Sequence, residues 1–218
     1  GFYGSVPIVA GTVPLAVGAG LAAKMQKTGD IGVAYFGDGA IEEGVVHESL
    51  NLARILDIPV LFVVENNLFA SHMHISLRQP QHTVARFAAA NDIPYAVVDG
   101  NDVLAVASQA EKFVEQARNG GGPGFIEAIT YRWYGHVDWR EDIDVGVARS
   151  TEDVASWRAR DPIRRLQDAL KVGGHWSAQD DNDLAAMDEL IDRAWEQAEN
   201  DPYPEASTLL SRVYGGNA

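Results

Sequence analysis

The sequence contains no cysteine. Disulfide bonds, thiolate metal sites and a cysteine nucleophile are therefore excluded. Basic residues are also scarce, because 17 Lys and Arg stand against 31 Asp and Glu and give a formal net charge of −14. A nucleic-acid groove, or a surface that binds an anionic membrane, needs a basic patch, so this balance argues against both.

Long uninterrupted apolar runs are missing as well. The apolar stretch at residues 2–23 is broken by six glycines and prolines, and no basic segment precedes it. It therefore resembles neither a signal peptide nor a membrane span. We expect a cytoplasmic protein that binds neither nucleic acid nor a membrane.

Apolar residues are nevertheless abundant, at 46% of 218 residues, which is ample for a hydrophobic core. A chain of this length predicts one α/β domain with a helical extension. We place the α/β domain at residues 1–150 and the C-terminal helical extension at residues 151–218. The extension begins with Ser150 at capping-box spacing from Asp153, a second helix begins at Asp161-Pro162, and a third, long and acidic, opens at Ser177 and runs to about Asn200.

Two apolar runs, residues 31–36 and 59–65, predict neighbouring strands. Neither run alternates polar with apolar residues, which is typical of strands in a parallel sheet that is covered on both faces. Residues 41–56, which lie between them, carry apolar side chains at helical spacing. The sequence therefore predicts a mostly parallel sheet with helices on both faces. Further along we expect a helix over 81–90, strands over 94–98 and 125–132, and a helix capped by Asp102.

Polar residues follow both of the first two strands. Asp38 comes after the first strand and Asn67 after the second, so both fall at the carboxyl edge of the sheet, where open α/β sheets bind ligands. A carboxylate, an amide oxygen and the backbone carbonyl of Phe69 are hard oxygen ligands that suit Mg²⁺. Gly37 and Gly39 let the backbone come close to a bulky anion, and the N–H groups of Gly39 and Ala40 favour a phosphate. The sequence therefore predicts a site for a magnesium diphosphate.

Ordered motifs along the chain resemble those of one family. They are Gly37-Asp38-Gly39, His47-Glu48-Ser49-Leu50-Asn51-Leu52-Ala53, Val63-Val64-Glu65-Asn66-Asn67-Leu68-Phe69, Val98-Asp99-Gly100-Asn101-Asp102, Tyr131-Arg132-Trp133-Tyr134-Gly135-His136 and Arg160-Asp161-Pro162-Ile163. Together they resemble the alpha subunit of the thiamine-diphosphate-dependent decarboxylating component of 2-oxo acid dehydrogenases (pyruvate and branched-chain types) and of acetoin dehydrogenases. The resemblance implies the thiamine-diphosphate-binding fold, with thiamine diphosphate and Mg²⁺ as cofactors.

The resemblance also implies roles for particular residues. Asp38, Asn67 and the Phe69 carbonyl would hold Mg²⁺, and Gly39 and Ala40 would contact the diphosphate. The remaining cofactor contacts and catalytic candidates that it implies are Val9 by its backbone, Arg132 near the phosphate or supporting the loop, His136 facing the cofactor and reacting centre, and Glu48 in an acidic channel between two active sites.

Departures from the family pattern define what this chain lacks. The family has a preceding segment with further diphosphate contacts, Pro7 replaces a usual glycine, and Val137 replaces a serine that eukaryotic relatives phosphorylate. The glutamate that activates the cofactor belongs to a beta subunit in two-chain members of the family. The resemblance therefore implies an α2β2 heterotetramer, a lipoyl-bearing acyltransferase partner and a small 2-oxo acid or acetoin as substrate.

Several interpretations stay open at this stage. Glu48 has a functional or a structural role, since the family often has a second acid where Val45 stands. His72 and His74 form either a metal pair or structural contacts. Small residues in the helix expected over 9–27 serve core packing or a subunit interface, and residues 133–150 form an active-site lid or a surface loop. A split transketolase-like subunit and a non-catalytic binding or assembly module are the rival functions.

Overall fold

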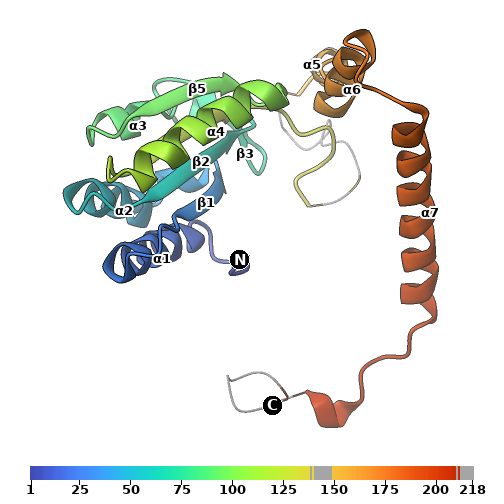
Figure 1. Cartoon of the computed structure of the whole chain (residues 1–218), viewed down its shortest axis with the longest axis horizontal. Helices are drawn as coiled ribbons and strands as arrows, with labels where there is room; N and C mark the ends of the chain where they lie inside the picture. Colours follow the sequence, from blue (N-terminus) through green and yellow to red (C-terminus); the bar gives the residue numbers. More distant parts are fainter. Residues whose placement is uncertain (138, 140–148, 210, 212–218) are drawn as a thin grey trace. The chain divides into compact units, whose positions relative to one another are not determined.

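A computed structural model describes residues 1–137, 139, 149–209 and 211. Its central sheet has four parallel strands in the order β1-β2-β6-β5. Figure 1 labels three of them, β1, β2 and β5. The strands are β1 (Gly32–Gly37), β2 (Val60–Asn66), β5 (Tyr95–Asp99) and β6 (Gly124–Ile129). Since all four run in the same direction, their carboxyl ends lie on one edge of the sheet, as the sequence predicts.

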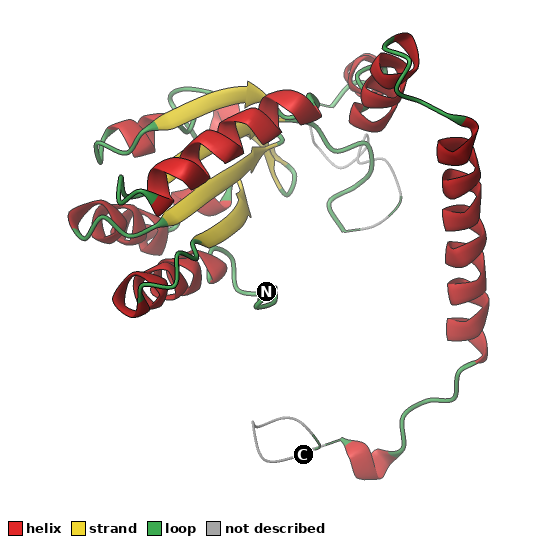
Figure 2. Cartoon of the chain, viewed as in Figure 1, coloured by secondary structure: helices red, strands yellow, loops and turns green. Residues whose placement is uncertain are grey.

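Helices cover both faces of this sheet (Figure 2). The helices that pack on it are α1 (Thr12–Gln26), α2 (Gly44–Ile55) and α4 (Val103–Arg118). One core joins α1 and α2 to alternate sheet residues such as Phe62 and Phe125, and a second core joins Phe113 of α4 to the opposite side chains, Leu61 and Ile126. The α/β class with a parallel sheet and helices on both faces is confirmed.

Two glycines let α1 lie directly on the sheet. A Cβ built on Gly32 would come within 2.1 Å of the Ala16 carbonyl oxygen, and one built on Gly20 would come within 2.7 Å of the Pro59 carbonyl oxygen. The small residues on this face of α1 therefore serve core packing. Leu15 and Gly18 lie on the exposed side of the helix, where the interface interpretation stays a prediction.

The prediction of a helix over residues 81–90 is wrong. Only α3 (Arg86–Ala89) is helical there. Instead, the N–H groups of Val84 and Ala85 donate to Oε2 of Glu127, at 3.0 and 2.8 Å respectively. A buried side chain from a distant strand thus takes the N–H groups with which a longer helix would begin.

The helix expected over residues 41–56 is interrupted near its start. A 3₁₀ turn, η1 (Ala40–Glu42), is followed by Glu43 in an extended conformation, and α2 begins only at Gly44. The strand expected over 125–132 also ends earlier than predicted, at Ile129. Gly39 and Ala40 therefore open a short turn and not the long helix itself.

The C-terminal helices begin at the predicted caps. They are α5 (Thr151–Arg158), α6 (Pro162–Val172) and α7 (Ala178–Asn200), followed by η3 (Ala206–Thr208). Ser150 accepts the Asp153 N–H at 3.0 Å, and Asp102 caps α4 in the same way. The chain divides into two compact units, Gly1–Leu166 and Gln167–Ala218, and the domain boundary expected after residue 150 stays a prediction. None of the helices within the described ranges has the length and apolar character needed to cross a membrane.

Candidate functional site

The tips of β1 and β2 meet at the carboxyl edge of the sheet. Gly37 pairs with Glu65 in the parallel register, so Asp38 and Asn67 each lie just beyond paired strand residues. The backbone N–H of Asn67 is close enough to stabilise the charged form of the Asp38 carboxyl group. The two residues that the sequence selects are therefore neighbours in space.

A short hairpin follows Asn67 and packs on the β1 tip. It consists of β3 (Phe69–Ala70) and β4 (Met73–His74), and η2 (Ile75–Leu77) continues from it. The Asn67 side-chain oxygen accepts the N–H of Phe69 at 3.1 Å, which closes a tight turn after β2. A Cβ on Gly39 would lie 2.7 Å from the Cβ of Ala70, whereas Gly37 has open space at the same position. Gly39 is therefore required by the hairpin that packs on it.

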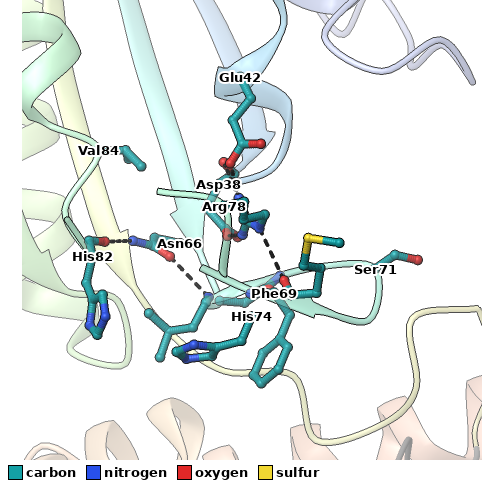
Figure 3. Close-up of polar contacts among 12 residues, drawn as sticks. Asp38, Glu42, Asn66, Phe69, Ser71, His74, Arg78, His82 and Val84 are labelled. Atoms are coloured by element: carbon teal, nitrogen blue, oxygen red, sulfur yellow. Dashed lines mark hydrogen bonds and ion pairs between the residues drawn. The ribbon is translucent and has the colours of Figure 1, made fainter. Parts of the chain in front are cut away.

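Arg78 joins the hairpin to the β1 tip. Its guanidinium donates to Oδ2 of Asp38 and to the carboxylate of Glu42, and its Nε donates to the Met73 carbonyl at 3.1 Å (Figure 3). The Arg78 side chain is only 7% exposed. This buried fork of donors fixes both the position and the rotamer of the Asp38 carboxylate.

The second oxygen of that carboxylate differs from the first in its surroundings. Asp38 is fully buried, and its Oδ1 has no hydrogen-bond partner among the described residues. Burial raises the pKa of Asp38 above its ordinary value of 3.8, although the hydrogen bond and the positive charge of Arg78 oppose the rise. A buried carboxylate oxygen without a donor is costly unless a cation or a proton occupies it. A carboxylate oxygen, the Asn67 amide oxygen and the Phe69 carbonyl are the kinds of ligand that Mg²⁺ prefers, and their joint binding of the ion stays a prediction.

Aromatic packing anchors the hairpin from the other side. The buried Phe69 ring meets Tyr131 edge to face at 5.9 Å, and Tyr131 stacks on Trp157 of α5 at 5.5 Å. Arg132 donates to the carbonyl of Ser71 at 2.8 Å, so it holds the turn between β3 and β4. This turn is not the loop of residues 133–150 that the resemblance assigns to Arg132, so support of that loop stays a prediction. Contact of Arg132 with a phosphate stays a prediction as well.

The other candidate residues lie on exposed segments. Val9 is exposed in the turn before α1, Glu48 is exposed on α2, and His136 is exposed in the segment after β6. Their proposed roles stay predictions. Most of the expected lid, residues 138 and 140–148, lies outside the described residues.

The histidines near the hairpin show side-chain contacts. His74 Nδ1 accepts the Ser76 N–H at 3.2 Å, and its ring packs against Phe69 at 5.0 Å and His82 at 5.8 Å. Across the described ranges, no three His, Cys, Asp or Glu side chains group in a way that could hold a metal ion. The geometry therefore offers His74 a structural role in the hairpin.

Two residues of this region are not predicted from the sequence. Arg78 is the only Lys or Arg between Arg54 and Arg86, which is a weak signal at best. Glu127 is a single acid in the otherwise apolar strand β6, and it is fully buried. An acid inside a buried strand needs partners, and this signal was available in the sequence.

Comparisons with known proteins show which family the chain resembles. The family model described as "Dehydrogenase E1 component" matches residues 1–207. The alpha subunit of acetoin:2,6-dichlorophenolindophenol oxidoreductase from Bacillus subtilis (strain 168) is 37% identical, over 98% of this chain and 63% of its own length. The pyruvate dehydrogenase E1 component subunit alpha of Rhizobium meliloti (strain 1021) is 35% identical, over 97% of this chain and 60% of its own length.

A third relative is named for a different substrate. The 3-methyl-2-oxobutanoate dehydrogenase subunit alpha of Mycobacterium tuberculosis (strain ATCC 25618 / H37Rv) is 36% identical, over 97% of this chain and 58% of its own length. The chain thus spans about three-fifths of the length of these curated relatives. Because the family model matches nearly all of its residues, the chain belongs to the dehydrogenase E1 component family.

Proposed function

We propose that the chain is the alpha-type subunit of a thiamine-diphosphate- and Mg²⁺-dependent dehydrogenase that acts on a 2-oxo acid or acetoin. The observation that carries the proposal is the buried Asp38 carboxylate, whose Oδ1 lacks a partner among the described residues, directly beside Asn67. The relatives are named as acetoin, pyruvate and 3-methyl-2-oxobutanoate enzymes, so this chain is assigned the substrate class that they share.

The residues at the strand tips would divide the work of binding. Asp38, Asn67 and the Phe69 carbonyl would hold Mg²⁺, and the N–H groups of Gly39 and Ala40 would face the diphosphate. Open space beside Gly37 leaves room for a bulky anion at the end of β1. When bound, thiamine diphosphate supplies the carbon nucleophile and the electron sink for decarboxylation or C–C cleavage.

Other residues would act around the reacting centre. His136 would orient the substrate or stabilise developing charge, which suits an imidazole near neutral pH. Val9 would contact the cofactor ring through its backbone. Arg132 would support the diphosphate through the turn that it already holds at Ser71. Glu48, exposed on α2, would face a partner subunit and not the core.

A single chain would supply only half of the active site. The relatives are named as alpha subunits, which supports a beta-type partner that completes the site, in an α2β2 assembly. Transfer of the acyl group would then require a lipoyl-bearing acyltransferase component. Alone, the chain would bind the cofactor weakly and turn over no substrate.

Reconstitution with a beta-type subunit tests the proposal. The pair would be assayed with pyruvate, branched 2-oxo acids and acetoin and an artificial electron acceptor, with and without thiamine diphosphate and Mg²⁺. We expect turnover that requires both subunits and both cofactors. Cofactor binding with sugar-phosphate transfer would favour a transketolase-like subunit, and absence of cofactor binding by the pair would favour an assembly module.

A further inference from the structure

Glu127 lies in the middle of the sheet without a role in the chemistry described above. It belongs to β6, between Val64 of β2 and Val97 of β5 in the register, and it is 0% exposed. Its described hydrogen bonds come from neutral donors. A buried carboxylate is expensive to keep, so its retention in an apolar strand calls for a specific task.

The carboxylate holds two different segments. On one side it accepts from Thr83 Oγ1 at 2.6 Å and from the N–H groups of Val84 and Ala85 at 3.0 and 2.8 Å. On the other side it accepts from Nδ2 of Asn66 at 2.7 Å. Asn66 is the last residue of β2 and immediately precedes the candidate metal ligand Asn67.

The bond to Asn66 fixes the orientation of that amide group. Nδ2 donates to Glu127 and to the His82 carbonyl at 3.1 Å, so Oδ1 must point the other way, where it accepts the Leu68 N–H at 3.1 Å. Figure 3 shows the bond between Asn66 and His82. A flipped amide would place its oxygen against the carboxylate and its NH₂ group against the Leu68 N–H. Glu127 therefore allows only one of the two amide orientations.

The Leu68 contact controls the turn that carries the metal ligands. Leu68 has φ +70°, a left-handed conformation that a bulky residue adopts only when its surroundings impose it. Asn67 and Phe69 flank it, and both contribute oxygens to the proposed Mg²⁺ site. The Asn66 amide thus connects the carboxylate of Glu127 to the backbone of this turn.

We infer that Glu127 is a positioning residue, which holds the turn of Asn67 and Phe69 in its ligating form through the side chain of Asn66. The inference rests on the proposed function for its metal, although the geometry of the turn can be measured without one. Loss of partners that orient metal ligands commonly lowers metal affinity by about 10- to 100-fold.

Two substitutions separate this path from general core packing. Glu127→Gln keeps the size but replaces one acceptor oxygen by a donor, so it cannot serve all the donors that converge on it. Thr83→Ala is the matched control, because it removes a bond to the same carboxylate and leaves the bond to Asn66 in place. Asn66→Ala breaks the connection while leaving Glu127 bonded to Thr83, Val84 and Ala85, and it serves if Glu127→Gln does not fold.

The first readout is amide hydrogen exchange of Leu68 and Phe69 in the full chain, measured by NMR. We expect exchange about tenfold faster in Glu127→Gln or Asn66→Ala, and rates within about twofold of wild type in Thr83→Ala. Unchanged exchange at both amides in a folded Glu127→Gln variant, or in Asn66→Ala where the former does not fold, would overturn the inference. Equal acceleration in Thr83→Ala would overturn it as well.

The second readout is calorimetric titration with thiamine diphosphate at several Mg²⁺ concentrations, in the presence of the beta-type subunit. Glu127→Gln should need about tenfold more Mg²⁺ than Thr83→Ala for the same cofactor affinity. An identical Mg²⁺ requirement in the two variants would contradict the role of Glu127. Failure of the wild-type pair to bind the cofactor, with faster Leu68 exchange in the variant, would refute the proposed function and leave the control of the turn by Glu127 supported.

Discussion

Arg78 donates to Oδ2 of Asp38, and Oδ1 of the same buried carboxylate has no partner among the described residues. The two oxygens of one side chain therefore face different tasks. Arg78 fixes the carboxylate to the hairpin, and the remaining oxygen is the one that would bind Mg²⁺ in the proposed site. The charge of Arg78 also makes burial of Asp38 tolerable before any cation binds.

Replacing Arg78 by methionine should destabilise the fold by about 3–5 kcal/mol, because it leaves a buried carboxylate without its counter-charge. Urea unfolding followed by circular dichroism would measure the loss. Arg78→Lys keeps the charge but not the planar fork, so its loss should be smaller. The double variant Asp38→Asn/Arg78→Met should recover part of the stability, because the buried charge at position 38 is then gone and only the partly exposed carboxylate of Glu42 loses its partner. Additive losses in the double variant would show that the two side chains do not depend on each other.

Alanine at position 39 should displace the hairpin, because its Cβ would lie 2.7 Å from that of Ala70. We expect Gly39→Ala to cost about 1–3 kcal/mol of unfolding free energy, as overpacking does elsewhere. Gly37→Ala is the matched control, since nothing lies within 4 Å of its added methyl group. Combining Gly39→Ala with Ala70→Gly removes the clash and should restore most of the loss. If Gly39→Ala and Gly37→Ala lose the same unfolding free energy, the result would contradict the close contact between Gly39 and Ala70.

Asp99 should make stability depend on pH. Burial alone would raise its pKa, but hydrogen bonds from Arg165, the Asn101 N–H and Arg160 outweigh burial and hold the pKa below the ordinary 3.8. The charged form is thus favoured by folding. Its contribution is fully present above pH 3.8 and is lost as pH falls through the lowered pKa of the folded state.

The Asp99→Asn variant measures this contribution. Since the Asp99 side chain is 32% exposed, we expect a loss of about 1 kcal/mol at neutral pH. The difference from wild type should shrink below the ordinary pKa, as seen in urea unfolding at several pH values. Asp30→Asn, at an exposed position before β1, is the control. A difference that stays constant down to about pH 3 would contradict the assigned ion pairs.

The sequence predicts the sheet and the place of the candidate site at its carboxyl edge, because both depend on local patterns. Continuous apolar runs identify β1 and β2, and parallel strands necessarily bring Asp38 and Asn67 to the same edge. Helix starts at Ser150, Asp161 and Ser177 are predictable for the same reason, since capping is a short-range hydrogen bond.

The sequence does not predict the contacts that join distant segments. Arg78 is 40 positions from Asp38, and Glu127 is 61 positions from Asn66. The spacing of apolar and polar residues along the chain does not predict such pairs. The same distant carboxylate explains why helix propensity misleads over residues 81–90, because tertiary hydrogen bonds to Val84 and Ala85 override it.

The most direct test of the central claim is the binding of thiamine diphosphate to the chain paired with a beta-type subunit, titrated calorimetrically with and without Mg²⁺. Asp38→Asn keeps the shape of the side chain and removes the charge that a divalent cation needs. We expect wild type to bind the cofactor only with Mg²⁺, and Asp38→Asn to bind at least about 100-fold more weakly. Cofactor binding that ignores Mg²⁺, or an Asp38→Asn variant that binds as well as wild type, would contradict the account.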